Sequence, residues 1–378
     1  MKVRFALYRC ILIILVIGLT NCKQIRKVTD AIVPPTAREL YAREFQEGDT
    51  TELNRWEKAF RIAQLDSLKI ELPYVEVGTY YQNRNEVYSY ESYLQEGSIL
   101  KIVAKTDVLG VKVFLDVLKK ELDSSFTTLS SNGFENSFIE VPIESSGWYK
   151  IMIQPAIEAT GNFRHEVITK PSFGFPVLGK DNTAIQSYWG AARDGGVRSH
   201  EGIDIFAERG TPIIAVSEGR VSSTGNRGLG GKQVWLRTGL FGKSVYYAHL
   251  DSILTSAGKK VKKGDTLGLV GNTGNARTTK PHLHFGIYKS GKGAINPLPF
   301  VQQTQIPELK AVPKITPLIK VSAARANLRD APSLKGIVIG ETILNDTLKL
   351  LGYTDDWAHV LKPEGIKAFV HRSLISAP

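Results

Sequence analysis

The sequence predicts a mainly β, multidomain protein that begins with a short helical segment. The chain has 378 residues, two or three times the length of a typical domain, so a single hydrophobic core is not expected. Apolar and polar residues alternate in several runs between residues 73 and 170, which indicates strands with one buried face. Residues 171–300 contain 22 of the 34 glycines, a density typical of the tight turns in a β-rich domain.

Residues 1–22 have the layout of a secretory signal. Basic residues precede the apolar run from Ile11 to Leu19, which is shorter than the ~20 residues that a transmembrane helix needs. The run LTNC that ends at Cys22 resembles the cleavage box of bacterial lipoproteins, which implies cleavage before Cys22 and lipid attachment to it. We therefore expect a membrane-anchored lipoprotein of the cell envelope, on the periplasmic side or at the cell surface, with residues 23–36 as a polar tether. The alternative is an uncleaved signal anchor in which Cys22 is incidental.

Residues 37–72 have a helical pattern. Leu53, Trp56, Phe60 and Ala63 fall near one face of the predicted helix, and Thr51 is its predicted N-cap. This face predicts packing against a neighbouring element rather than a function of its own.

The alternating runs between residues 73 and 170 predict an antiparallel β-sandwich with a jelly-roll-like arrangement. They contain no cluster of metal-ligating or nucleophilic residues, so we expect an accessory or spacer role. The alternation is carried by residues 100–104, 111–117 and 149–153.

Two further segments follow the glycine-rich region. Residues 301–318 carry three prolines and no periodicity, which predicts a linker. Residues 319–378 contain short β runs, of which NLR at 327–329, WAHV at 357–360 and AFVH at 368–371 resemble bacterial SH3-type modules. That resemblance implies a small SH3-like barrel. Such modules often dock cell-wall enzymes on their substrate, and a purely structural barrel is the alternative.

Two short motifs in the glycine-rich region have the composition of a metal site. His200 and Asp204 form an H-x-x-x-D motif, and nearby glycines disfavour a helix, so we expect an extended chain in which positions i and i+4 share a face. His282 and His284 form an H-x-H motif whose imidazoles face the same side of a strand. Two adjacent strands would bring two nitrogen ligands and one oxygen ligand to one cation. That set suits zinc with a fourth position open for water.

The surroundings of these motifs resemble the lysostaphin/LytM-type zinc endopeptidases. The resemblance covers residues 171–300 and rests on RSHEGID at 198–204, YAHL at 247–250, VKKGDTLGLVGNTG at 261–274 and PHLHFG at 281–286. It implies an antiparallel-β peptidase domain, one zinc ion per chain and peptidoglycan as the substrate.

The same resemblance implies a role for each residue of the site. His200, Asp204 and His284 correspond to the zinc ligands, and His282 to the general base beside the metal-bound water. His249 corresponds to the histidine that helps to stabilise the oxyanion. The set is complete, which distinguishes this chain from degenerate members of the family that activate other wall enzymes.

Other motifs carry less information. GNRGLGGK at 225–232 departs from the phosphate-binding loop at two positions, and we expect a mobile hairpin beside the cleft instead. His165, His359 and His371 lie outside the motif block, and we assign them no role.

The formal net charge of +11 indicates a polyanionic partner. The excess lies in residues 171–300, where 17 Lys and Arg accompany 8 Asp and Glu, and the export signal disfavours nucleic acid. We therefore predict a lipid-anchored zinc endopeptidase that cuts cross-link or stem peptides of peptidoglycan. A non-catalytic regulator of another wall hydrolase and a secreted peptidase for glycine-rich proteins are the alternatives. Both Gly–Gly bridges and D-Ala to diamino-acid cross-links stay open as the scissile bond.

Overall fold

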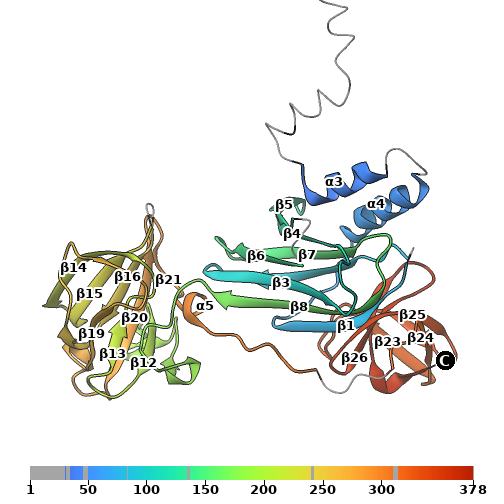
Figure 1. Ribbon diagram of the computed structural model, residues 1–378. Coiled ribbons are helices and arrows are strands. Elements are labelled where there is room, and N and C mark those ends of the chain that lie inside the picture. The colour runs from blue at the N-terminus through green and yellow to red at the C-terminus, as the bar shows by residue number, and fades with distance from the viewer. Residues whose placement is uncertain are drawn as a thin grey trace, which may run out of the picture.

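Figure 1 shows the chain as a computed structural model in which strands dominate, as the sequence predicts. The structure describes residues 30, 35–45, 50–82, 84–133, 137–239, 242–309 and 314–377. The predicted signal, Cys22 and most of the predicted tether lie outside these residues. None of the helices described in those ranges has the length and apolar character needed to cross a membrane.

Two antiparallel sheets face each other between residues 74 and 171 and form the sandwich. Alternate residues of each sheet point inward, and the shared core contains Leu100, Ile102, Leu115 and Ile151, all fully buried. The first sheet contains, in order, β1 (Tyr74–Tyr80), β8 (Gly161–Pro171), β3 (Ser98–Thr106) and β6 (Phe138–Pro142). The second contains, in order, β2 (Tyr88–Leu94), β7 (Gly147–Pro155), β4 (Val113–Lys120) and β5 (Phe126–Ser131).

Helices α3 (Ala37–Glu44) and α4 (Thr51–Ala63) lie against the second sheet (Figure 1). Trp56 of α4 packs on Phe114 of β4 with ring centroids 5.1 Å apart, and its indole N–H donates to the Pro155 carbonyl at 2.8 Å. Residues 113–118 of β4 are consequently buried on both faces. The N-cap of α4 is Thr50, and Thr51 is the first helical residue, so the predicted cap was one position late.

The C-terminal strands form a barrel that is joined to the sandwich. Val77 of β1 pairs with Tyr353 of β25, and the two sets of strands make one continuous sheet. The strands of the barrel are β22 (Leu318–Val321), β23 (Arg325–Arg329), β24 (Val338–Ile343), β25 (Thr347–Thr354), β26 (Trp357–Leu361), β27 (Lys367–His371) and β28 (Ile375–Ser376), with a 3₁₀ turn at Arg372–Leu374.

A buried polar cluster lies where the barrel meets the sandwich. Glu76 of β1 accepts from His359 of β26 at 3.0 Å, and neither side chain is exposed. His165 of β8, also fully buried, bonds to the hydroxyl of Tyr80. Two histidines to which the sequence assigned no role are therefore part of this junction.

The glycine-rich domain contains an eight-stranded antiparallel sheet. Within it β20 lies between β16 and β12, so β20 is hydrogen-bonded on both sides. The sheet contains β9 (Ile185–Ser187), β12 (Ile203–Phe206), β14 (Gly219–Arg227), β15 (Gly231–Arg237), β16 (Ser244–Ala248), β18 (Lys260–Val261), β20 (His282–Lys289) and β21 (Gly293–Ile295). Outside it lie a three-stranded sheet of β13 (Pro212–Ile214), β19 (Thr266–Val270) and β17 (Leu250–Ile253), a ribbon of β10 (Ala192–Arg193) and β11 (Arg198–Ser199), and 3₁₀ turns at Asn182–Ala184, Asp194–Gly196 and Gly274–Ala276.

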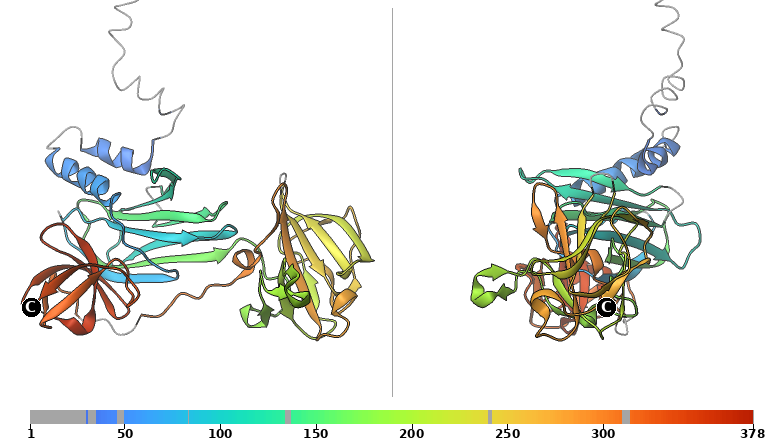
Figure 2. Two further views of the ribbon diagram at one scale, coloured as in Figure 1. Left: turned by 180° about the vertical axis from the view of Figure 1, so that it is seen from behind. Right: turned by 90° about the vertical axis from the view of Figure 1, so that its left-hand side faces the viewer.

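The glycine-rich domain and the barrel lie at opposite ends of the sandwich (Figure 2). Helix α5 (Leu298–Val301) closes the glycine-rich domain, and its Phe300 carbonyl accepts from the Phe173 amide at 2.8 Å. Lys289 forms an ion pair with Glu96 of the sandwich at 2.8 Å. From residue 302 the chain runs back along the sandwich towards β22 (Figure 1).

Candidate active site

The three predicted metal ligands, His200, Asp204 and His284, converge at one point beside the eight-stranded sheet. Asp204 of β12 lies directly opposite His284 of β20, so the two side chains share a face. Oδ1 of Asp204 lies 3.0 Å from Nδ1 of His284 and 3.0 Å from Nε2 of His200. The two nitrogens are also 3.0 Å apart. These three donor atoms could hold a metal ion.

His200 precedes β12 and is held by the backbone around it. Its amide donates to the Ala191 carbonyl at 2.8 Å, and its Nδ1 lies 2.9 Å from the Tyr188 carbonyl. Because only a protonated nitrogen can bond to a carbonyl, Nδ1 carries the proton and Nε2 presents its lone pair to the site.

Gly202 is the residue that lets the His284 ring approach β12. A Cβ at this position would lie 2.6 Å from Cε1 of His284 and 2.7 Å from the Phe285 carbonyl oxygen. The glycine between His200 and Asp204 is therefore required by packing rather than by an unusual backbone angle.

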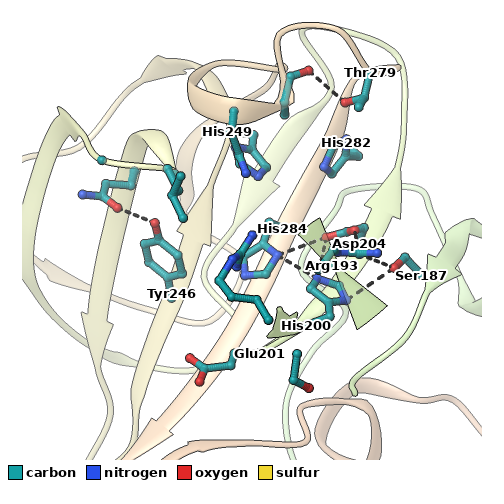
Figure 3. A pocket seen from close by; sticks show the side chains of 18 of the residues that line it. Ser187, Arg193, His200, Glu201, Asp204, Tyr246, His249, Thr279, His282 and His284 are labelled. Carbon is teal, nitrogen blue, oxygen red and sulfur yellow. Dashed lines mark hydrogen bonds and ion pairs between the residues drawn. The ribbon is translucent and has the colours of Figure 1, made fainter. Parts of the chain in front are cut away.

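His249 and His282 lie next to each other, above His284 and Asp204 in the view of Figure 3. Their ring centroids are 5.1 Å apart, and His249 lies 5.8 Å from His284. His249 directly follows β16 and has a positive φ of 64°, which turns its side chain towards the cleft.

Backbone carbonyls also orient these two rings. Nδ1 of His249 lies 2.8 Å from the Thr273 carbonyl, and Nδ1 of His282 lies 2.8 Å from the Lys280 carbonyl. Both Nδ1 atoms are therefore protonated, and in the neutral rings Nε2 is a proton acceptor.

Burial and neighbouring charges shift the ionisation of the site. Burial opposes the ionised form of Asp204, but the hydrogen bond from His284 and the adjacent His200 ring outweigh it and hold the pKa of Asp204 well below its usual range. Burial, with the nearby His282 and His284, lowers the pKa of His249 to about 4. Burial also lowers the pKa of His284. Both shifts favour the neutral form of the His249 and His284 rings at pH 7.

Arg193 is a site residue that sequence reasoning missed. Its Nη2 donates to Oδ2 of Asp204 at 2.8 Å and to Oγ of Ser187 at 2.5 Å. The sequence shows only that Arg193 is a basic residue in the segment before His200. It does not show how the ribbon of β10 and β11 folds back towards Asp204.

The site opens into a cleft of about 1110 Å³. The predicted hairpin at 225–232 borders it through Arg227, Gly228, Leu229 and Gly230. Within the described residues, the whole lining comes from residues 187–288. It comprises Ser187, Arg193, Val197, Arg198, Ser199, His200, Glu201, Asp204, Phe206, Arg227, Gly228, Leu229, Gly230, Gln233, Tyr246, His249, Asn275, Ala276, Thr279, His282, His284 and Tyr288.

Comparison with family models finds two matches. Residues 198–297 match peptidase family M23, and residues 324–376 match the bacterial SH3 domain.

Similar curated proteins match the same part of the chain. An "uncharacterized metalloprotease" of Haemophilus influenzae is 42% identical over 105 residues, which cover 28% of this chain and 21% of the relative. The L-Ala--D-Glu endopeptidase of Bacillus subtilis is 36% identical over 123 residues, which cover 30% of this chain and 37% of the relative. The peptidoglycan DD-endopeptidase ShyA of Vibrio cholerae is 36% identical over 121 residues, which cover 31% and 26%. The chain thus spans between 21% and 37% of the length of these relatives.

A solved structure matches too. The catalytic domain of the antimicrobial peptidase lysostaphin from Staphylococcus simulans is 33% identical, and the match covers 30% of this chain and 89% of that one at a TM-score of 0.28.

Proposed function

The chain carries a peptidase family M23 domain and a bacterial SH3 domain, and from this premise we propose that it is a zinc-dependent endopeptidase of peptidoglycan. The observation that carries the proposal is one open cleft in which His200, Asp204 and His284 converge beside His249 and His282. Two imidazole nitrogens and one carboxylate oxygen suit zinc, with one position left for water or substrate. Zinc there would lower the pKa of a bound water and polarise the scissile carbonyl.

We assign His282 as the general base. Its Nδ1 proton is committed to the Lys280 carbonyl, so the lone pair on Nε2 is the one available to take a proton from the attacking water. The ring stacks on Phe206 at a centroid distance of 5.0 Å, which restricts its rotation.

The geometry refines the role that family resemblance implies for His249. A neutral His249 has no N–H to offer the cleft, because its single proton is held by the Thr273 carbonyl. His249 can donate to an oxyanion only after Nε2 has accepted a proton. We therefore assign it to proton transfer first and to oxyanion stabilisation once protonated.

The test is digestion of purified sacculi with zinc-loaded protein. Wild-type protein should release muropeptides, and His284→Ala and Asp204→Asn should not. Asp251→Asn is the matched control, because Asp251 pairs with Arg209 outside the cleft. Equal release by all proteins, or by none, would contradict the proposal. No lysis by the protein alone, combined with stimulation of another wall hydrolase, would favour the regulator instead.

The products identify the bond. Mass spectrometry of muropeptides from walls of known chemistry separates cleavage of Gly–Gly bridges from cleavage of D-Ala to diamino-acid cross-links. Hydrolysis of a glycine-rich peptide panel without any action on sacculi would favour the secreted peptidase.

We also propose that the protein is exported and anchored to a membrane of the cell envelope through a lipid on Cys22. The proposal rests on the sequence pattern of residues 1–22. In cells grown with labelled palmitate, the wild type should incorporate the label and Cys22→Ala should not. A wild-type protein that takes up no label, or a Cys22→Ala variant labelled equally, would contradict the lipid anchor.

A further inference from the structure

We propose that Arg193 is a positioning residue that fixes Asp204 as a metal ligand through one oxygen only. The inference rests on the proposed function insofar as it takes His200, Asp204 and His284 to be the metal site. It adds a residue outside the motifs that define that site.

The two oxygens of Asp204 have separate partners. Oδ1 faces His200 and His284, at 3.0 Å from each. Oδ2 accepts from Nη2 of Arg193 at 2.8 Å (Figure 3). A carboxylate with one oxygen held by a guanidinium presents the other oxygen to the metal in a fixed orientation.

The Arg193 contact lies where the pairing of β9 with β12 is irregular. Ser187 of β9 is the partner of Asp204 across the β9–β12 pairing, and the register shifts between Asp204 and Ile205. A register shift of this kind interrupts the backbone hydrogen bonds locally. Nη2 of Arg193 bonds to both partners at once, to Oγ of Ser187 and to Oδ2 of Asp204, so it ties the edge strand to the ligand strand where the ladder is irregular.

Ser187, which accepts a hydrogen bond from Arg193, also lies beside a second predicted ligand, His200. Oγ of Ser187 lies 3.3 Å from Nδ1 of His200, the nitrogen that faces away from the metal site. Arg193 and His200 also lie on one short segment, because β10 and β11 pair and β11 leads directly into His200. The ribbon that carries His200 to the site therefore also delivers the guanidinium that orients Asp204.

The ion pair between Arg193 and Asp204 is largely shielded from solvent. The side chain of Asp204 is 11% exposed and that of Arg193 is 31% exposed.

The experiment measures metal binding on the full chain with Arg193→Ala, Arg193→Lys and the control Arg227→Ala. Arg227 lines the same cleft, and its guanidinium donates to Ser223. Zinc affinity is read by competition with a chromogenic chelator, and ligand geometry by the visible absorption of the cobalt(II)-substituted protein.

We expect Arg193→Ala to weaken zinc affinity by about 10- to 100-fold and to change the cobalt spectrum. Arg193→Lys should restore most of both, because a single nitrogen makes both contacts in the wild type. Arg227→Ala should bind zinc as the wild type does. Thermal melting of the metal-free proteins shows whether Arg193→Ala is folded.

Wild-type zinc affinity and an unchanged cobalt spectrum in folded Arg193→Ala would overturn the inference. So would an equal loss in Arg227→Ala. If the metal-binding differences hold but no variant or wild type cuts sacculi, the proposed function fails while the positioning role of Arg193 stands.

Discussion

Backbone carbonyls determine which ring nitrogen points into the cleft in three of its four histidines. In His200, His249 and His282 the Nδ1 atom is held by a carbonyl from a neighbouring loop, and Nε2 faces inward. His284 differs, because its Nδ1 faces Asp204. The folded backbone thus sets the tautomers before any substrate arrives.

Replacing His282 or His249 should lower the rate of hydrolysis without lowering the zinc content. We expect His282→Ala and His249→Ala to lower the rate of sacculus hydrolysis by about 100- to 10,000-fold, because each removes a proton-transfer group. Zinc content, measured by elemental analysis, should stay at the wild-type level, since neither residue belongs to the converging donor set. Loss of zinc in either variant would assign that histidine to the metal instead.

Gly202→Ala should damage the metal site without changing any ligand. The new methyl group would collide with the His284 ring and the Phe285 carbonyl, so we expect weaker zinc binding and a loss of about 1–3 kcal/mol of unfolding free energy. Gly225→Ala is the matched control, because its Cβ would meet only Arg227 at 3.8 Å. Chelator competition and urea denaturation measure both effects, and equal behaviour of the two variants would contradict the steric explanation.

At the residue scale, the sequence allowed the meeting of three donor side chains to be predicted, but not the contact that supports them. His200, Asp204 and His284 were predicted to meet, because alternation within strands places them on one face, and the register confirms the pairing of Asp204 with His284. Arg193 could not be predicted, because its position depends on how the ribbon folds back and on a register shift that has no local sequence signature.

At the scale of elements, α4 is held by its buried face. Trp56 is fully buried against Phe114 and the Pro155 carbonyl, so Trp56→Ala should cost about 3–5 kcal/mol of unfolding free energy. Ile62→Ala, on the exposed side of the same helix, should change stability little. Urea denaturation followed by circular dichroism compares the two, and similar losses would show that α4 does not depend on this face.

The elements themselves were predictable where periodicity was strong. Of the predicted face of α4, Leu53, Trp56 and Ala63 are buried, and Phe60 is partly buried. The start of α4 was predicted to within one residue, whereas α3 was not distinguished as a separate helix within segment 37–72. The double-sided burial of β4 was also missed, since it depends on helices that pack on the sheet from another part of the chain.

At the scale of the whole molecule, the junction of barrel and sandwich should be sensitive to acid. Burial lowers the pKa of His165 to about 3, so the folded state excludes a proton that the unfolded chain binds below about pH 6.5. Burial opposes ionisation of Glu76, but the charge and hydrogen bond of His359 outweigh it and lower the pKa of Glu76. In both cases the unfolded chain takes up a proton at a higher pH than the folded state does, so the folded state loses stability as the pH falls.

We therefore expect the unfolding free energy to fall between about pH 6.5 and pH 4, with His165 contributing at most about 1.4 kcal/mol per pH unit. His165→Gln should make this pH dependence shallower, because glutamine can still accept from Tyr80 but cannot take up the proton. Urea denaturation at a series of pH values measures the slope. An unchanged slope in His165→Gln would contradict the assignment.

The joining of barrel and sandwich could not be predicted from the sequence. Val77 and Tyr353 are 276 positions apart, and each lies in a run that is explained by its own sheet. The same holds for His359, which looked incidental because its partner Glu76 belongs to the other end of the chain.

The origin of the cleft lining in one uninterrupted stretch, residues 187–288, has a consequence for inheritance. A stretch that contributes every described side chain around its own site can be moved between genes by recombination without losing that site. The neighbouring domains are then free to be exchanged. The barrel and sandwich, tied by β1 and β25, are instead expected to be inherited together, because separating them would expose a sheet edge and the Glu76–His359 pair.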